Sequence, residues 1–272
     1  MTLVSTDWLS ENLNKVKIVD ASWHLIKNRN AIEEYNREHI ENAIFFDLDK
    51  NSNHKKDLPH GHFLPSLSEH EKIISEMGIL NTDRIIIYCF SDLISSCRAW
   101  FQFLYFGHDP KLVSVLNGGM KKWKLEGRKV TNLKTKIIPS NYKAKENKEM
   151  IKIKSQIDEN IKTKEFTVLD ARSKNRFLGL EPEPRPGVKS GSIKGSKSMP
   201  LKEIVNIKDN TFLDKQKLRE IFNSSEINSN KIVMSCGSSV SAASLALAYS
   251  LINDDYIPKI YIGSWTEFGK NK

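Results

Sequence analysis

The sequence predicts an α/β protein of two tandem domains, each a parallel sheet with helices on both faces. Three observations support this prediction. In the first half of the 272 residues, short apolar runs typical of buried strands alternate with segments of helical period. The second half repeats this order at an offset of about 147 residues, the separation of Cys89 and Cys236. A polar, lysine-rich stretch lies between the halves, so we expect a duplicated domain rather than a solenoid of short repeats.

The elements of the first half follow from hydrophobic periodicity. Each expected strand is a short, mostly apolar run, and these runs are residues 16–21, 43–46, 85–88 and 112–116. Each expected helix places apolar residues on one face, and these segments are residues 32–39, 66–77 and 95–106. In the last of them, Trp100, Phe103 and Leu104 share that face. Alternating strands and helices of this kind favour a parallel sheet.

The second half repeats the first, element by element. Residues 166–172 correspond to the strand that begins at Lys17, and residues 231–236 correspond to the strand that ends at Cys89. The tract between the halves contains Pro139 and shows no clear period, which is typical of a linker. The expected boundaries are a first domain at residues 1–133, a linker at 134–150 and a second domain at 151–272.

Composition excludes several classes of protein. No apolar run approaches the ~18 residues of a membrane helix, so no membrane partner is expected. The first residues lack the charged and apolar regions of a signal peptide, so we expect a cytoplasmic protein. Three cysteines do not make a disulfide framework, and no pair has zinc-ligand spacing with histidines. No metal or cofactor is therefore expected.

The net charge of +9 would permit binding to nucleic acid. However, the lysines are scattered along the chain rather than gathered with aromatic residues. We therefore expect no nucleic-acid partner. The positive field is better suited to drawing in a small anionic substrate.

The stretch around Cys236 predicts a reactive site. A buried strand at residues 232–234 leads into a turn of small residues, and a helix follows at 241–252. The first N–H groups of such a helix stabilise an anion, and a thiolate is an anion. The alternative is a structural cysteine in the sheet core. Two features favour function: Cys236 follows the strand, and the next three residues are too small to cover it.

Two arginines in the second half are candidates for binding a carboxylate. Arg176 and Arg185 flank a proline-rich turn, and a guanidinium group donates two parallel hydrogen bonds to a carboxylate. The alternative is a pair of surface arginines bound to Glu181 and Glu183. Arg172 is expected to form structural salt bridges.

The segment Cys236-Gly-Ser-Ser-Val-Ser-Ala resembles the cysteine loop of the 3-mercaptopyruvate sulfurtransferases, the two-domain branch of the rhodanese family. Further matching motifs run along almost the whole chain. They include Val4–Leu9, Val19–Trp23, Phe45–Asp49, Phe106–Asp109, Leu116–Trp123, Leu169–Arg172, Arg176–Gly179, Glu181–Gly187 and Tyr261–Trp265. The resemblance implies two tandem rhodanese-like domains, of which only the second is catalytic.

The resemblance also implies roles for individual residues. Cys236 would carry the sulfur as a persulfide, and Arg176 and Arg185 would hold the substrate carboxylate. The other residues expected to bind substrate are those of the loop, Gly237, Ser239, Val240 and Ser241. A proton relay would consist of Asp49, His62 and Ser238, although His60 competes with His62. A thiol such as thioredoxin, or cyanide in an assay, would accept the sulfur.

Three alternative functions are weighed against this one. A thiosulfate sulfurtransferase is disfavoured because Gly237 and Ser238 are neutral where that enzyme has Arg and Lys. A phosphatase on the same fold is disfavoured because no arginine follows within the cysteine loop. The third alternative is a non-catalytic persulfide carrier.

Ser239 departs from the family's glycine and would strain the loop at positive φ. Cys89, at the equivalent place in the first half, is expected to be vestigial.

Overall fold

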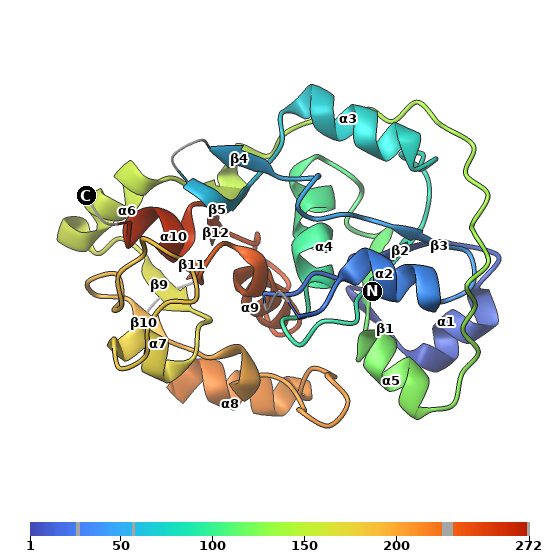
Figure 1. Cartoon of the computed structure of the whole chain (residues 1–272). Helices are drawn as coiled ribbons and strands as arrows, with labels where there is room; N and C mark the ends of the chain where they lie inside the picture. The colour runs from blue at the N-terminus through green and yellow to red at the C-terminus, as the bar shows by residue number, and fades with distance from the viewer. Residues whose placement is uncertain (26–27, 56–57, 225–230, 271–272) are drawn as a thin grey trace. The chain divides into compact units, whose positions relative to one another are not determined.

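The computed structural model describes residues 1–25, 28–55, 58–224 and 231–270. The chain divides into two compact units (Figure 1). The first unit consists of residues 1–52, 64–147 and 206–212, and the second of residues 53–63, 148–205 and 213–272. Each unit contains a five-stranded parallel sheet with helices packed against it, which confirms the predicted fold class. The domain boundaries expected from the sequence stay a prediction.

The first unit has the strand order β1-β7-β6-β2-β3. Its strands are β1 (Leu3–Val4), β2 (Lys17–Asp20), β3 (Ala43–Phe45), β6 (Ile85–Tyr88) and β7 (Val113–Leu116). Its helices are α1 (Thr6–Asn12), α2 (Ala31–Arg37), α3 (Leu67–Glu76), α4 (Ser96–Tyr105) and α5 (Gly119–Leu125). The central strand β6 is buried along its whole length, and α4, which packs on it, is buried at all but one position.

The second unit has the strand order β10-β9-β11-β12-β8. Its strands are β8 (Ile151–Lys152), β9 (Thr167–Asp170), β10 (Lys197–Ser198), β11 (Ile232–Ser235) and β12 (Ile260–Tyr261). Its helices are α6 (Lys154–Thr163), α7 (Lys174–Leu178), α8 (Lys215–Ser224), α9 (Val240–Ser250) and α10 (Ser264–Phe268). Two 3₁₀ turns lie at Lys148–Met150 and Leu201–Glu203.

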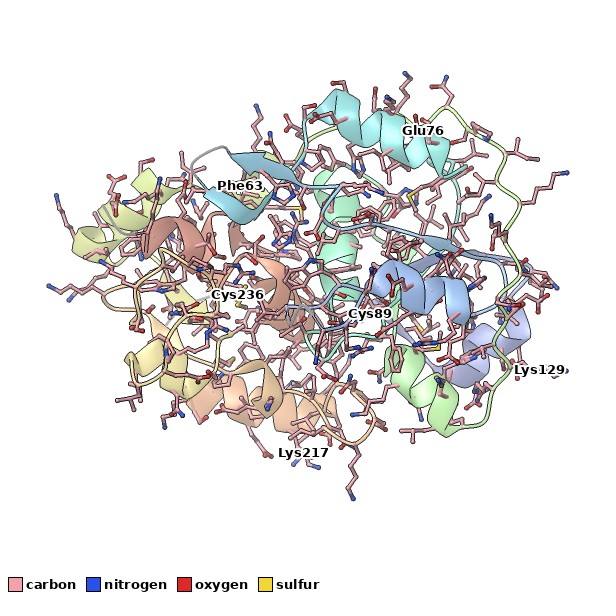
Figure 2. The ribbon with its side chains drawn as sticks, viewed as in Figure 1. Phe63, Glu76, Cys89, Lys129, Lys217 and Cys236 are labelled. Carbon is pink, nitrogen blue, oxygen red and sulfur yellow. The ribbon has the colours of Figure 1, made fainter. Side chains whose placement is uncertain are left out.

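The centre of the second sheet determines where the reactive loop lies. Strand β11 is wholly buried between β9 and β12, with Val233 opposite Val168 and Met234 opposite Ile260. Helix α9 is buried on every face from Val240 to Ala248, as expected for a helix that is apolar all round. The chain therefore leaves a central strand and enters a core helix within four residues, at Cys236 (Figure 2).

The sequence predicted most elements to within one or two residues, and β6 has the expected bounds. The sequence predicts no strand in the polar stretch around His60 and His62, and this omission is wrong. These residues lie on β5 (Leu58–Phe63), which pairs antiparallel with β4 (Asn53–Lys55) as a hairpin in the second unit. The polar composition of this stretch concealed the strands, because a two-stranded hairpin needs no buried apolar face of its own.

The stretch between the two sheets is held by hydrogen bonds to the first unit. The N–H of Ser140 donates to the Ser75 carbonyl at 2.8 Å, and the N–H of Asn147 donates to the Tyr105 carbonyl at 2.7 Å. Tyr142, between them, is fully buried. Over the described parts of the chain, no helix is long and apolar enough to cross a membrane.

Candidate active site

The loop that begins at Cys236 is held at both ends by one serine. The Ser264 hydroxyl accepts hydrogen bonds from the N–H of Ser239 at 3.0 Å and from the N–H of Cys236 at 3.4 Å. It donates in turn to the Tyr261 carbonyl at 2.9 Å. Ser264 is fully buried, so these bonds are made without competition from water. Sequence reasoning gave Ser264 no role, although it lies in the Tyr261–Trp265 motif.

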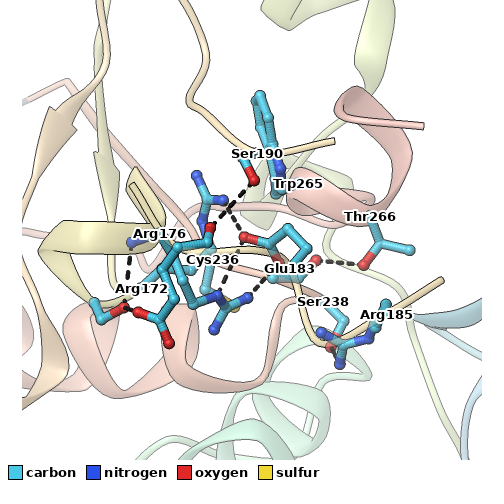
Figure 3. A network of polar contacts seen from close by, with 12 residues as sticks. Arg172, Arg176, Glu183, Arg185, Ser190, Cys236, Ser238, Trp265 and Thr266 are labelled. Atoms are coloured by element: carbon cyan, nitrogen blue, oxygen red, sulfur yellow. Dashed lines mark hydrogen bonds and ion pairs between the residues drawn. The ribbon is translucent and has the colours of Figure 1, made fainter. Parts of the chain in front are cut away.

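Helix α10 fixes the carbonyl groups of the same loop. The N–H of Trp265 donates to the Cys236 carbonyl at 2.9 Å. The Gly237 carbonyl accepts from both the N–H and the hydroxyl of Thr266, at 2.8 and 2.6 Å (Figure 3). Thr266 is a second residue that sequence reasoning missed. Because the first N–H groups of α10 are used by this loop, its backbone is fixed before any substrate binds.

Ser239 adopts the left-handed conformation that strains a serine at this position, with φ of +62°. A residue with a β-carbon is strained there by about 1 kcal/mol. Its side chain compensates, because the Ser239 hydroxyl donates to the His62 carbonyl at 3.2 Å. A glycine at this position would relax the backbone but would lose this bond to the β4–β5 hairpin.

Ser238 lies between an arginine and a histidine. The Nη2 group of Arg185 donates to the Ser238 hydroxyl oxygen at 2.7 Å, and the Nδ1 atom of His62 lies 3.0 Å from the same oxygen. All three side chains are buried. With one lone pair engaged by Arg185, the Ser238 proton can be donated to His62 Nδ1. The side chain of the competing candidate, His60, lies outside the described residues.

Arg176 and Arg185 both reach the residue that follows Cys236. A β-carbon built on Gly237 would lie 2.9 Å from Nη1 of Arg185 and 3.2 Å from Nη2 of Arg176. The two guanidinium groups therefore approach the same point beside the nucleophile, where the glycine leaves room for them. Two convergent guanidinium groups form a site for a carboxylate or another small anion.

The carboxylate partner of these arginines is buried, which differs from the expectation of ion pairs on the surface. Arg176 is bound by Glu183, as the alternative interpretation expected, but the Glu183 side chain is only 1% exposed. Arg172 forms the predicted structural salt bridges, to Asp170 at 2.6 Å and to Glu183 at 2.7 Å. Burial opposes the charged form of Arg172, yet the hydrogen bonds to Asp170 hold its pKa above the ordinary value.

The remaining predicted site residues lie in three places. Val240 and Ser241 are buried in the first turn of α9. Asp49 lies in a turn of the first unit, where its carboxylate accepts a hydrogen bond from the Trp23 indole at 3.0 Å. Its part in a proton relay with Ser238 therefore stays a prediction. In the ranges that the structure describes, no group of three or more His, Cys, Asp or Glu is placed to hold a metal ion.

The equivalent loop of the first unit has a different environment. Cys89 follows β6 (Figure 2), and burial raises the pKa of its thiol. Its sulfur lies 3.4 Å from the Ser96 hydroxyl. Arg29 reaches this loop, but its guanidinium group is bound to Glu34 and to the Phe90 carbonyl. Cys97 is fully buried in α4. A thiol whose pKa is raised is a poor nucleophile at neutral pH.

The chain is similar in sequence and in fold to known proteins. Residues 5–126 and 154–271 each match the rhodanese-like domain family. The chain is 34% identical to the mouse 3-mercaptopyruvate sulfurtransferase and 34% identical to the mouse thiosulfate sulfurtransferase, in each case over 98% of this chain and 91% of the relative. The crystal structure of the 3-mercaptopyruvate sulfurtransferase SseA from Escherichia coli is similar, with a TM-score of 0.85 and 28% identity over 97% of this chain and 99% of SseA.

Proposed function

This chain belongs to the rhodanese family and carries two of its domains, and from that premise we propose that it transfers sulfur from 3-mercaptopyruvate to a thiol acceptor through Cys236. It is a sulfur-transferring enzyme, as its relatives are. One observation carries the choice of site: Arg176 and Arg185 converge on Gly237, directly beside Cys236. A substrate carboxylate bound there places the rest of a small donor against the sulfur.

The first half of the reaction forms a persulfide. The Cys236 thiolate attacks the thiol sulfur of the donor, so a sulfur–sulfur bond forms as the donor's carbon–sulfur bond breaks. The electron pair of the broken bond leaves on the three-carbon fragment as an enolate. The proton of the donor thiol ends on that carbon, which gives pyruvate and leaves Cys236 as a persulfide.

Ser238 is placed to move that proton. Its hydroxyl oxygen lies 3.0 Å from His62 Nδ1, within the reach of direct proton transfer. Arg185 binds the same oxygen at 2.7 Å and stabilises negative charge on it. Arg185 therefore takes part both in binding the substrate carboxylate and in proton transfer. Asp49, the third member expected in the relay, lies in the first unit, and its part in the relay stays a prediction.

The charge of the loop supports 3-mercaptopyruvate over thiosulfate. The relatives do not discriminate, because enzymes named for either donor are equally similar to this chain. Thiosulfate is a dianion and favours further positive charge from the cysteine loop itself, whereas Gly237 and Ser238 are neutral. 3-Mercaptopyruvate carries its one charge on a carboxylate, for which the two arginines are sufficient.

In the second half of the reaction, an acceptor attacks the outer sulfur and releases the Cys236 thiolate. We propose a protein thiol such as thioredoxin as acceptor, with cyanide as its replacement in an assay. The proposed location is the cytoplasm, although one relative is named as mitochondrial. Cell fractionation tests the location, and turnover with reduced thioredoxin tests the acceptor.

The decisive experiment compares two donors. Purified protein and cyanide are incubated with 3-mercaptopyruvate or with thiosulfate, and release of pyruvate or of sulfite is measured. We expect a higher kcat/KM for 3-mercaptopyruvate, and one added sulfur on the peptide that contains Cys236. Cys236→Ser should lose all turnover, because a hydroxyl is a poor nucleophile at neutral pH. Turnover that survives in the serine variant, or a preference for thiosulfate, would contradict the proposal.

A further inference from the structure

Glu183 is a buried carboxylate beside the substrate site whose charge the proposed reaction does not use. Its side chain is 1% exposed. Its Oε1 atom accepts from Nη1 of Arg172 at 2.7 Å and from Nε of Arg176 at 3.1 Å, and its Oε2 atom accepts from Nη2 of Arg176 at 2.5 Å (Figure 3). Glu183 therefore binds both Arg172 and Arg176, and Arg176 is one of the two arginines proposed to hold the substrate carboxylate. We call Arg176 and Arg185 together the arginine clamp.

The charges in this network balance in a specific way. Asp170 is engaged with Arg172 through three hydrogen bonds between their side chains. Glu183 therefore balances the positive charge of Arg176. Glu183 therefore lowers the net positive charge that the arginine clamp offers to a substrate by one unit, while both guanidinium groups keep their places beside Gly237.

This balance bears on which donor is used. We infer that Glu183 is a specificity-determining residue, whose buried negative charge beside Arg176 disfavours a dianionic donor relative to a donor with one negative charge. The inference rests on the proposed function. The physical reason is that a unit charge inside the protein acts on both charges of a dianion but on only one of a monoanion, and burial keeps it unscreened by salt.

Two variants of Glu183, one that removes its charge and one that changes its length, test the inference. Glu183→Gln keeps the shape of the side chain and removes its charge. We expect the ratio of kcat/KM for thiosulfate to kcat/KM for 3-mercaptopyruvate to rise on the order of tenfold. Glu183→Asp keeps the charge and moves the carboxylate back, so both values should fall while their ratio stays near that of the wild type.

Glu181→Gln is the matched control. Glu181 lies two residues away in the same proline-rich turn, is exposed, and accepts a hydrogen bond from Ser173 at 3.3 Å. Because water screens its charge, the ratio should not change in this variant. A wild-type ratio in folded Glu183→Gln, or the same rise in Glu181→Gln, would overturn the inference.

A measurement on the wild-type protein covers the case in which Glu183→Gln does not fold. Alkylation of Cys236 by iodoacetamide is timed in the presence of pyruvate, a monoanion, or oxalate, a dianion of similar size. Pyruvate should protect Cys236 better at equal concentration, and equal or better protection by oxalate would contradict the inference. If the wild type releases no pyruvate from 3-mercaptopyruvate, the proposed function fails; if it does and the donor ratio is insensitive to Glu183, only this inference fails.

Discussion

The Nη1 atom of Arg185 lies 2.9 Å from the point that a β-carbon on Gly237 would occupy. This close approach explains why the residue after the nucleophile has no side chain. Gly237→Ala should fold, because the atom it meets is the far end of a flexible side chain. It should displace both guanidinium groups and lower kcat/KM for 3-mercaptopyruvate by about 10- to 100-fold, as for a lost charge-assisted hydrogen bond.

Formation of the persulfide and thermal unfolding serve as controls for the Gly237→Ala variant. Gly237→Ala should still accept one sulfur on Cys236 at a high donor concentration, and its thermal unfolding should be close to that of the wild type. Unchanged kinetics in a folded alanine variant would show that the substrate carboxylate is bound elsewhere.

The two arginines should respond differently to a lysine. Either Arg176→Leu or Arg185→Leu should weaken use of 3-mercaptopyruvate by about 10- to 100-fold. Arg185→Lys should recover only part of this loss, because an ammonium group cannot bind the carboxylate and the Ser238 hydroxyl in the same fork geometry. Arg176→Lys should recover less, since it also loses the two-point contact with Glu183. Steady-state kinetics of the four variants measure this order.

Cys89 should not take part in turnover. Burial raises the pKa of its thiol, and its nearest polar neighbour is a serine hydroxyl rather than a free cation. Cys89→Ser should retain near-normal kcat, and thiol labelling of the wild type at pH 7 should modify Cys236 first. Rapid labelling of Cys89, or a persulfide on it after donor treatment, would reverse this assignment.

Asp20 should make the stability of the protein depend on pH. Burial raises the pKa of its carboxyl from 3.8 to about 6, although Ser22 donates two hydrogen bonds to it. The native protein therefore binds more protons than the unfolded chain between pH 4 and 6, so stability falls as pH rises through this range. The loss is on the order of 2 to 3 kcal/mol.

The Asp20→Asn variant isolates this effect. The free energy of unfolding of Asp20→Asn should depend less on pH than that of the wild type. The difference between the variant and the wild type should therefore shift in favour of the variant between pH 4.5 and pH 7. Urea unfolding at the two pH values measures the difference, with the exposed Asp254→Asn as control. A constant difference between Asp20→Asn and wild type would show that the carboxyl has an ordinary pKa in the folded protein.

The comparison of Asp20 with Asp170 shows how the two domains diverged. Both aspartates end a strand that lies next to the central strand of its sheet, and both are followed by an alanine. In the second unit Arg172 comes next and neutralises the carboxylate, whereas in the first unit Ser22 comes next and offers only neutral donors. One substitution after the strand therefore separates a charged network from an isolated buried acid.

The sequence by itself determined the repeated α/β plan, the strand that ends at Cys236 and the pair formed by Arg176 and Arg185. These features depend on short-range pattern: the alternation of apolar runs and the identity of the residues in one loop. Such patterns can be recognised from the sequence, because the apolar runs of strands and the period of helices involve residues that are close along the chain.

Tertiary structure alone decided which side chains meet at the site. It placed His62 on a strand against Ser238, assigned Ser264 and Thr266 to the backbone of the cysteine loop, and buried Glu183 between two arginines. In the sequence, Glu183 reads as an exposed residue of a proline-rich turn. Its burial, and with it the strength of its charge, depends on how the turn folds back onto Arg172 and Arg176, eleven and seven residues earlier, and local composition does not encode that.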